Sequence, residues 1–268
     1  MLNELCTRLD SQAAMLVRIE STQGSVPRGV GAWMAVFADG VLGTIGGGHV
    51  EFQAIDDARQ RLAGVAGDNT LRYTLGPSLG QCCGGVVWLS FERVTAANIP
   101  ALQARLATPR TPVALFGGGH VGKAMVKVLG LLPFSVMWID SRDEIFPADL
   151  PTNVHCEHSD PVQTAVKDLA PGSHVLVMSF SHAEDLDIVA ACLARQREHD
   201  DLPYIGLIGS TTKWATFRHR LQERGFTAAE LERVTCPIGL AGIHRKEPEV
   251  IAVSVAAQLL QIETPSQP

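Results

Sequence analysis

The segment that most narrows the possible folds is Gly117-Gly118-Gly119-His120-Val121-Gly122, which directly follows a short apolar run. Gly117, Gly119 and Gly122 match the G-x-G-x-x-G pattern, whose glycines permit a tight turn, close approach of a pyrophosphate and tight packing of helix on strand. Helical spacing follows, and the next apolar run ends at Asp140, where an acid can bind a ribose hydroxyl. This order of strand, glycine turn, helix, strand and acid predicts a Rossmann-type fold, with NAD(P) or another nucleotide as a candidate ligand.

The rest of the second half continues this alternation. Further apolar runs lie at 153–156, 174–179 and 204–208. Because strands that are apolar throughout are typical of parallel sheets buried on both faces, the pattern predicts an α/β domain with a parallel sheet. Helices are expected at about 121–132, 160–170, 184–198, 211–224 and 248–262.

Two prolines in the segment 107–112 mark a change in the organisation of the chain. Proline removes a backbone donor and biases the preceding residue toward extended backbone, which suits a linker. We therefore expect two domains, 1–107 and 108–268.

The first half has the pattern of an α+β domain with antiparallel strands. Strands are expected at 15–20, 32–38 and 86–91, with a hairpin turn at Asp39-Gly40. A helix is expected from Gly48 to Ala63, and its apolar side is predicted to carry Phe52, Ile55, Ala58 and Leu62.

The letters GGGHV also occur at 46–50, but Glu51 stands where the last fingerprint glycine would be. A carboxylate there would repel a pyrophosphate, so this copy is not expected to bind a second dinucleotide. Gly46, Gly47 and Gly48 still form a glycine-rich turn that opens a helix. Two interpretations stay open: a site for a phosphate or another anion, or an ordinary tight turn whose acid is favourable to the helix dipole.

Cys82 and Cys83 form an adjacent pair with Gln81 before them and glycines close on both sides. Glycine neighbours leave thiols accessible, and a nearby cation such as Arg28 would favour the thiolate. Such a pair can ligate a soft metal or hold a sulfur-bearing ligand, and no spacing for a closed zinc site accompanies it. The alternative is two buried cysteines at the start of the next strand. The other four cysteines stand singly among apolar neighbours, which is typical of small core residues.

Three polar residues of the second half follow apolar runs, at the edge where open parallel sheets bind ligands. His182 can act as an acid, a base or a donor to a ligand, and the alternative is a helix-start residue facing water. Ser210 is expected to cap the following helix. Lys213 lies in its first turn, which is unfavourable for the dipole unless an anion is bound there. The tract 244–246 is expected in a solvated turn.

Composition excludes several classes of protein. With 46% hydrophobic and 19% charged residues the chain is too apolar to be disordered, and a net charge of −6 argues against a general nucleic-acid binder. We find no secretory signal and no apolar stretch of the roughly 20 residues that a membrane span needs. Six cysteines do not form a disulfide framework. We therefore expect a reduced, cytoplasmic protein with no nucleic-acid and no membrane partner.

Eight segments follow one another along nearly the whole chain: GSVPRGVGAWM, GTIGGGHVE, LGPSLGQCCGGVV, FGGGHVGKA, WIDSRDEIFP, SHAEDLD, YIGLIGSTTKW and CPIGLAGIHRKEPEVIAVSVAAQLL. In this combination they resemble the XdhC/CoxI family of xanthine dehydrogenase accessory proteins. The resemblance implies an N-terminal XdhC/CoxI α+β domain before the Rossmann-like domain. It also implies a chaperone instead of an enzyme, which binds molybdopterin, the molybdenum cofactor, and favours its sulfurated form. The expected partners are the apoenzyme of xanthine dehydrogenase or a related molybdenum hydroxylase, and a cysteine desulfurase as the sulfur source.

The resemblance further implies which residues meet the cofactor: Pro27, Arg28, Gly46 to Gly48, Glu51, Gln81, Cys82 and Cys83, with the two thiols contacting molybdenum or its sulfido ligand. We expect no catalytic residue. We also expect the protein to form a homodimer. Ser179-Phe180 stands where relatives usually have Thr-His, so the SHAEDLD segment lacks one histidine of the pattern. The alternative function is an NAD(P)-dependent oxidoreductase that uses Gly117 to Gly122 and Asp140.

Overall fold

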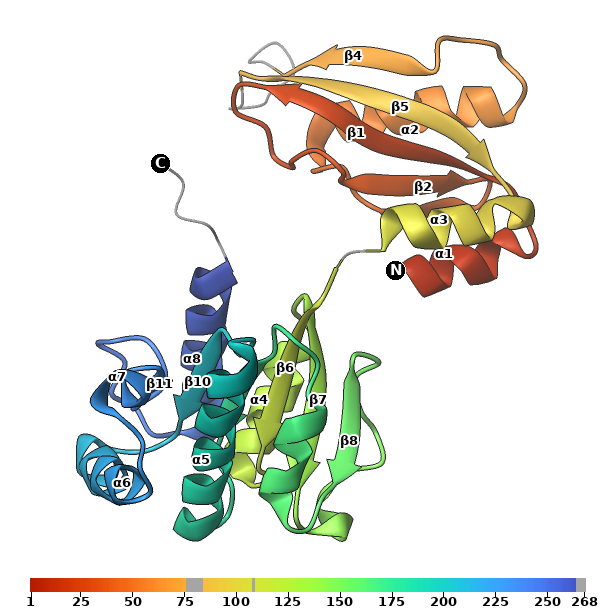
Figure 1. Ribbon diagram of the computed structural model, residues 1–268. Coiled ribbons are helices and arrows are strands. Elements are labelled where there is room, and N and C mark those ends of the chain that lie inside the picture. The colour runs from red at the N-terminus through yellow and green to blue at the C-terminus, as the bar shows by residue number, and fades with distance from the viewer. Residues whose placement is uncertain (76–83, 108, 264–268) are drawn as a thin grey trace. The chain divides into compact units, whose positions relative to one another are not determined.

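The computed structural model describes residues 1–75, 84–107 and 109–263. The chain divides into two compact units, Met1–Ala107 and Thr108–Pro268. Each unit has its own sheet and its own buried apolar clusters (Figure 1). Gln81, Cys82 and Cys83 lie outside the described residues, so their predicted roles stay predictions.

The N-terminal unit contains a fully antiparallel sheet with the strand order β3-β2-β1-β5-β4. Its strands are β1 (Ala14–Gln23), β2 (Trp33–Phe37), β3 (Gly40–Gly43), β4 (Thr70–Thr74) and β5 (Val86–Val94). The hairpin predicted at Asp39-Gly40 is confirmed, because Phe37 of β2 pairs with Gly40 of β3.

Helices cover both faces of this sheet. Helix α2 (Gly48–Leu62) packs on one face, while α1 (Leu2–Leu9) and α3 (Ile99–Leu106) pack on the other. Side chains along β1 alternate between the two faces, as a pleated strand requires: Met15 and Val17 face α2, and Leu16 faces α1 and α3.

The predicted apolar side of α2 is partly wrong. Its buried residues are Val50, Ala54 and Ala58, whereas Phe52 is 72% exposed. Residues four apart lie on one face of a helix, so the true stripe is rotated away from Phe52. Phe52 therefore lies on the solvent side, in the first turns of α2.

The C-terminal unit contains a fully parallel sheet with the order β11-β10-β9-β6-β7-β8. Its strands are β6 (Thr111–Phe116), β7 (Phe134–Asp140), β8 (Val154–His158), β9 (His174–Val177), β10 (Tyr204–Leu207) and β11 (Val234–Thr235). The chain starts in the middle at β6, runs outward to β8, returns to β9 and continues outward to β11. The strand order reverses between β6 and β9, which is the point where open α/β sheets bind ligands.

Helices also cover both faces of the parallel sheet. Helices α4 (His120–Leu129) and α8 (Pro248–Glu263) pack on one face, and α5 (His182–His199) and α6 (Thr211–Glu223) pack on the other. The helix expected at 160–170 is a 3₁₀-helix, η4 (Val162–Asp168), and the short α7 (Ala228–Leu231) precedes β11. The predicted fold class is confirmed. Within the described residues, no helix has the length and apolar character that crossing a bilayer requires.

The four single cysteines differ in exposure. Cys192 of α5 is fully buried, as expected, but Cys156 on the edge strand β8 is exposed, so the expectation of a core residue is wrong there. An edge strand has a neighbour on one side only, and β8 pairs with β7 alone. Cys6 and Cys236 are partly exposed.

Candidate functional site

In the N-terminal unit, Pro27 and Arg28 pack against the glycine turn that opens α2. A Cβ atom at Gly46 would lie 2.7 Å from Cγ of Pro27 and 3.3 Å from Cγ of Arg28. Gly46 also has a φ of 126°, a conformation that favours glycine. The structure therefore brings together two of the segments that the sequence singled out.

A third glycine-rich segment joins them at Gly84-Gly85. The amide of Leu75 donates a hydrogen bond to the carbonyl oxygen of Gly85 at 2.8 Å. A Cβ at Gly85 would approach the carbonyl oxygens of Gln23 and Ser25 to less than 3.0 Å. Leu75 and Gly84 are the described residues on either side of the segment that contains Gln81, Cys82 and Cys83. They thus lie beside the end of β1, at the end of the sheet where α2 begins (Figure 1).

Two glycines in this region have no packing reason to be glycine among the described residues. No described atom lies within 4 Å of a Cβ built on Gly29 or Gly84, and neither residue has a positive φ. Gly47, whose φ is 74°, also borders open space. Bare backbone that faces open space permits close approach of a ligand, so this part of the unit fits a bound molecule.

Glu51 supplies an anion to the glycine turn from within the chain. Its Oε2 atom accepts hydrogen bonds from the amides of Ile45 at 2.9 Å and Gly47 at 3.1 Å, and from the hydroxyl of Thr44. The turn thus has the geometry of the second interpretation, an acid that stabilises its own turn. An external anion would have to use the amides of Gly48 and His49, because the first N–H groups of a helix have no acceptor within it.

Arg28 supplies positive charge to this end of the unit. Its side chain is exposed, and no described residue forms an ion pair with it. A free guanidinium beside a glycine turn can hold a phosphate with two parallel hydrogen bonds. Pro27, Arg28 and Gly46 to Gly48 therefore form one cluster, as the predicted cofactor region requires.

In the C-terminal unit, two of the three fingerprint glycines are required by packing. A Cβ at Gly117 would lie less than 3.0 Å from the carbonyl oxygen of Met178, and one at Gly122 equally close to that of Gly117. Gly119, in contrast, faces open space with nothing described within 4 Å. Only Gly119 has the surroundings that an approaching phosphate would need.

Asp140 is fully engaged by its own chain. Its carboxylate accepts bonds from the amide of Gly118 at 2.6 Å and from the backbone and side chain of Arg142 at 2.8–2.9 Å. Burial raises the pKa of this carboxyl, but the bonds from Arg142 and the Gly118 amide outweigh it and hold the pKa below its usual value. Ile145 packs over Gly118. Four accepted bonds fill the acceptor capacity of a carboxylate, so none is left for a ribose hydroxyl in this arrangement.

His182, Ser210 and Lys213 do come together, in a pocket at the carboxyl edge of the sheet. It has a volume of about 350 Å³ and is also lined by Thr212, Thr216, Phe217 and Arg220. The anion expected near Lys213 is Asp185, whose Oδ2 accepts from Nζ at 2.5 Å. Sequence analysis missed Asp185 and Arg220, although the four-residue spacing of Thr212, Thr216 and Arg220 places them on one helix face.

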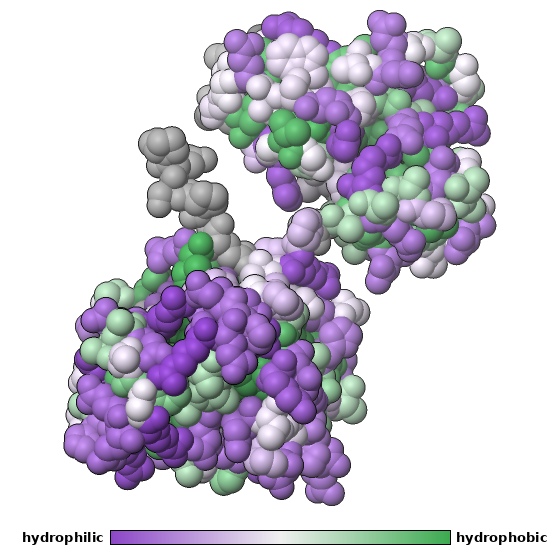
Figure 2. Space-filling view, viewed as in Figure 1, coloured by the Kyte–Doolittle hydropathy of each residue, from purple (hydrophilic) through white to green (hydrophobic). Residues whose placement is uncertain are grey.

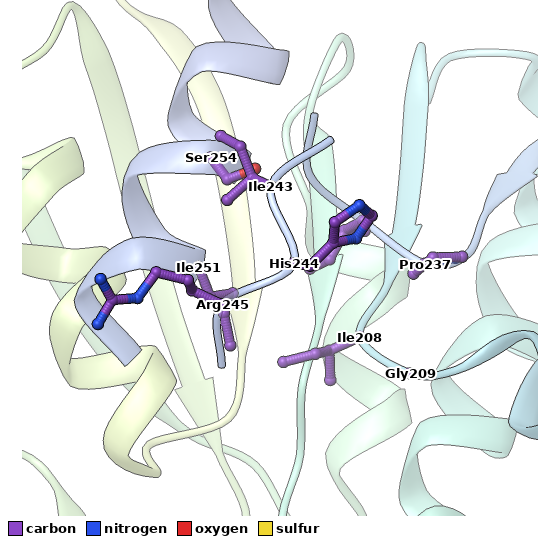
Figure 3. A pocket seen from close by; sticks show the side chains of 9 residues that line it. Ile208, Gly209, Pro237, Ile243, His244, Arg245, Ile251 and Ser254 are labelled. Atoms are coloured by element: carbon purple, nitrogen blue, oxygen red, sulfur yellow. The ribbon is translucent and has the colours of Figure 1, made fainter. Parts of the chain in front are cut away.

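A second pocket, of about 170 Å³, lies between the end of β10 and the start of α8 (Figure 3). Ile208, Ile238, Ile243 and Ile251 give it apolar walls. His244 and Arg245, predicted in a solvated turn, are exposed at its rim and extend to opposite sides of their loop. Arg245 pairs with Glu247, and the hydroxyl oxygen of Ser254 accepts from the amide of Leu240, so His244 is the polar side chain of this lining that the described contacts leave available.

Comparison with known families identifies this chain. The model of the XdhC Rossmann domain matches residues 113–259, more than half of the chain, and the model of the XdhC and CoxI family matches residues 8–74. The chain belongs to the XdhC and CoxI family. The predicted family is thereby confirmed.

One curated protein and one solved structure are similar to this XdhC-family chain over most of its length. It is 28% identical over 260 residues to the uncharacterized protein YqeB of Escherichia coli K12. The aligned region covers 92% of this chain but only 43% of YqeB. The chain thus spans less than half the length of this curated relative. A Bacillus halodurans crystal structure, described as a xanthine dehydrogenase, matches 100% of this chain and 98% of its own, with a TM-score of 0.78 and 20% identity. At that identity the likeness shows a shared fold.

The predicted residues of this XdhC-family protein fall into two separate groups. Pro27, Arg28, Gly46 to Gly48 and Glu51 cluster in the N-terminal unit, and His182, Ser210 and Lys213 meet in the C-terminal one. The fingerprint glycines and Asp140 stand apart from both groups, at the turn that follows β6. Among the residues that the structure describes, no three His, Cys, Asp or Glu side chains come together as a metal site. Cys82 and Cys83, the predicted metal contacts, are not among those residues.

Proposed function

We propose that this protein is a chaperone for the molybdenum cofactor, which protects the sulfurated cofactor and inserts it into xanthine dehydrogenase or a related molybdenum hydroxylase. Membership in the XdhC and CoxI family supports an accessory role in place of a catalytic one. The observation that carries the proposal is the convergence of three glycine-rich segments, one of which carries Arg28, beside the two ends of the cysteine-bearing segment.

The chemistry of molybdopterin fits the groups in this cluster. The cofactor carries a phosphate, a dithiolene and a reactive Mo=S unit. Arg28 and the free amides of Gly48 and His49 suit the phosphate. Gly29 and Gly84 leave room for close approach, and Gln81 adds an amide. Cys82 and Cys83 supply soft sulfur ligands for molybdenum or contacts to its sulfido ligand. The role of the chain is to bind, orient and exclude water, and it requires no catalytic residue.

The same proposal names the partners. A cysteine desulfurase supplies the sulfur, and the apoenzyme of the hydroxylase receives the loaded cofactor, in the cytoplasm. The carrier works as a homodimer. The chain spans less than half the length of its curated relative. The partners are therefore part of the proposal and do not follow from the comparison with that relative.

Co-purification tests the carrier role. The protein is isolated from a host that makes molybdopterin, and the bound pterin is oxidised and measured by fluorescence. We expect Cys82→Ala, Cys83→Ala and the double variant to remain folded, retain less pterin and activate apo-dehydrogenase less. Cys156→Ala is the matched control, because Cys156 is an exposed cysteine of the other unit. Unchanged retention and activation in both single variants and the double would contradict the cysteine role.

An oxidoreductase function has less support from the geometry. Asp140 is bound by Gly118 and Arg142, and Ile145 packs over Gly118. Calorimetric titration with NAD⁺ and NADP⁺ is the direct check. We expect no saturable binding of either; tight binding accompanied by hydride transfer would replace the carrier proposal with the enzyme.

A further inference from the structure

We propose that the Rossmann unit holds a separate oxyanion site, a pocket between α5 and α6 that binds the phosphate group of a small ligand. The pocket is lined by His182, Ser210, Thr212, Lys213, Thr216, Phe217 and Arg220. It lies beyond the ends of β9 and β10 and is distinct from the glycine turn that follows β6.

The lining of this pocket contains donors and no carboxylate. Arg220 and His182 are exposed, and no described acid pairs with either. Ser210 and Thr212 contribute hydroxyl groups, whereas the hydroxyl of Thr216 already donates to the carbonyl oxygen of Thr212 at 3.2 Å. A guanidinium surrounded by hydroxyl donors is the usual protein environment of a phosphate.

The acids near the pocket are held by other partners. Asp185 is 1% exposed and accepts from Lys213 at 2.5 Å and from the amide and hydroxyl of Ser179 at 2.8–2.9 Å. Glu184 accepts from Ser141 at 2.7 Å. On the outer side, Asp187 pairs with Arg224, and Glu223 lies 3.4 Å from His219. Among the described residues, no carboxylate lines the pocket and none forms an ion pair with Arg220, while Glu223, three residues further along α6, is exposed to solvent.

Lys213 lines the pocket, but its ammonium group is already bonded within the chain. Its Nζ atom is held by Asp185 and by the carbonyl oxygen of Ile208, at 2.5 and 2.8 Å. The cation left for a ligand is Arg220, two turns further along α6. Arg220 lies in the last turn of α6, whereas the positive end of the helix dipole acts within the first turn, near Ser210 and Thr212.

Two sources of phosphate share this chemistry: inorganic phosphate and a phosphate monoester. The test uses the full chain at low ionic strength, because screening weakens contacts at an exposed guanidinium. Inorganic phosphate and ribose 5-phosphate are titrated separately and followed by calorimetry and by ³¹P NMR. Neither probe is molybdopterin, so the result does not depend on the proposed carrier function.

Arg220→Gln is the test variant, and Arg218→Gln is its matched control. Arg218 lies on the same exposed helix, carries the same charge and does not line the pocket. We expect saturable phosphate binding by the unchanged protein and by Arg218→Gln, and a loss of about tenfold or more in affinity for Arg220→Gln. Circular dichroism checks that both variants fold.

Either of two results would overturn the proposal: no saturable binding of either probe to the unchanged protein, or an equal loss in the two variants. Where the loss is confined to Arg220→Gln, the two probes identify the source. Tighter binding of ribose 5-phosphate supports a monoester ligand, and tighter binding of inorganic phosphate supports the free ion.

Discussion

Glu51 shows how a single side chain can decide what a glycine turn does. Its carboxylate accepts from Ile45, Gly47 and Thr44, which lie four to seven residues before it. The sequence left open whether this turn is an anion site or an acid-stabilised turn, because spacing does not tell which way a side chain reaches. The described geometry favours the second interpretation.

Removing this carboxylate should loosen the start of α2. We expect Glu51→Ala to lower the free energy of unfolding of the N-terminal unit by about 1–2 kcal/mol, because two backbone donors lose a charged acceptor. Urea titration followed by circular dichroism measures the change. Asp56→Ala, an exposed substitution on the same helix, is the control and should alter stability by less than about 0.5 kcal/mol. Equal effects of the two substitutions would show that the turn does not depend on Glu51.

Asp140 and Arg142 give a second prediction at the residue scale, one of pH dependence. The pKa of Asp140 is held below its usual value of 3.8 although burial opposes this, because Arg142 and the amide of Gly118 bond the charged form. A carboxyl with a lowered pKa contributes stability that is complete above the unfolded value and is lost as the pH falls through the folded pKa.

Arg142→Gln removes the cation, so the pKa of Asp140 should rise. The folded and unfolded pKa values of Asp140 are then closer together, so the variant should be less stable at neutral pH and lose less stability on acidification than the unchanged protein. Denaturant midpoints measured between neutral pH and about pH 3 follow this shift. Arg218→Gln provides the reference, since no described acid pairs with Arg218. Parallel pH curves for the unchanged protein and Arg142→Gln would refute the coupling.

At the scale of secondary-structure elements, the fingerprint glycines separate into packing and open positions. Gly122→Ala would place a Cβ less than 3.0 Å from the carbonyl oxygen of Gly117, so α4 would have to move off β6. We expect a destabilisation of about 2 kcal/mol or more. Gly119→Ala meets no described atom within 4 Å, so its cost should be limited to the poorer N-cap that alanine provides, about 1 kcal/mol or less. Thermal unfolding of the two variants decides, and a large loss for Gly119→Ala would contradict this division.

The central strands of the parallel sheet, β6, β7, β9 and β10, could be predicted because each is a short, largely apolar run, and the helices between them have apolar residues at helical spacing. β11 was missed because its two residues, Val234–Thr235, are too few to form a pattern. Helix α1 was missed although Leu2, Leu5 and Leu9 have helical spacing, and two of these leucines are buried. Phe52 was placed on the wrong face because apolar spacing in α2 allows two stripes, and packing against the sheet selects Val50, Ala54 and Ala58.

The candidate site could be predicted from sequence only in its parts. Glycine-rich segments are easily recognised in the sequence. Their convergence, however, depends on the antiparallel strand order β3-β2-β1-β5-β4, which no local sequence pattern encodes. The same holds for the pocket between α5 and α6. His182 and Ser210 follow neighbouring strands and were predictable, whereas Arg220 lies two turns into a helix and became relevant only through the geometry of α6.

At the scale of the whole molecule, each of the two units has what an independent domain needs. Each has a sheet with helices on both faces and two apolar clusters of its own. On the faces visible in Figure 2, hydrophilic residues cover most of both units, and apolar ones occur in small groups. Such units are expected to fold separately.

Fragments 1–107 and 109–268 test this expectation. Expressed alone, each should unfold in one cooperative transition, with a midpoint close to that of the matching transition in the full chain. Circular dichroism in urea is the measurement. A fragment without a cooperative transition would show that its core is incomplete without the other unit.

The two GGGHV turns show how little information five shared letters carry about a ligand. The same five residues stand at the start of α2 and of α4, but the residue that follows them differs. Glu51 accepts a hydrogen bond from its own turn, whereas Gly122 allows α4 to pack closely against the turn after β6. A search pattern that scores the five letters alone counts two dinucleotide sites in this chain, and one that weighs the sixth leaves a single candidate. The discriminating signal thus resides in the sixth residue, which bonds to its own turn in one copy and allows close packing of the helix in the other.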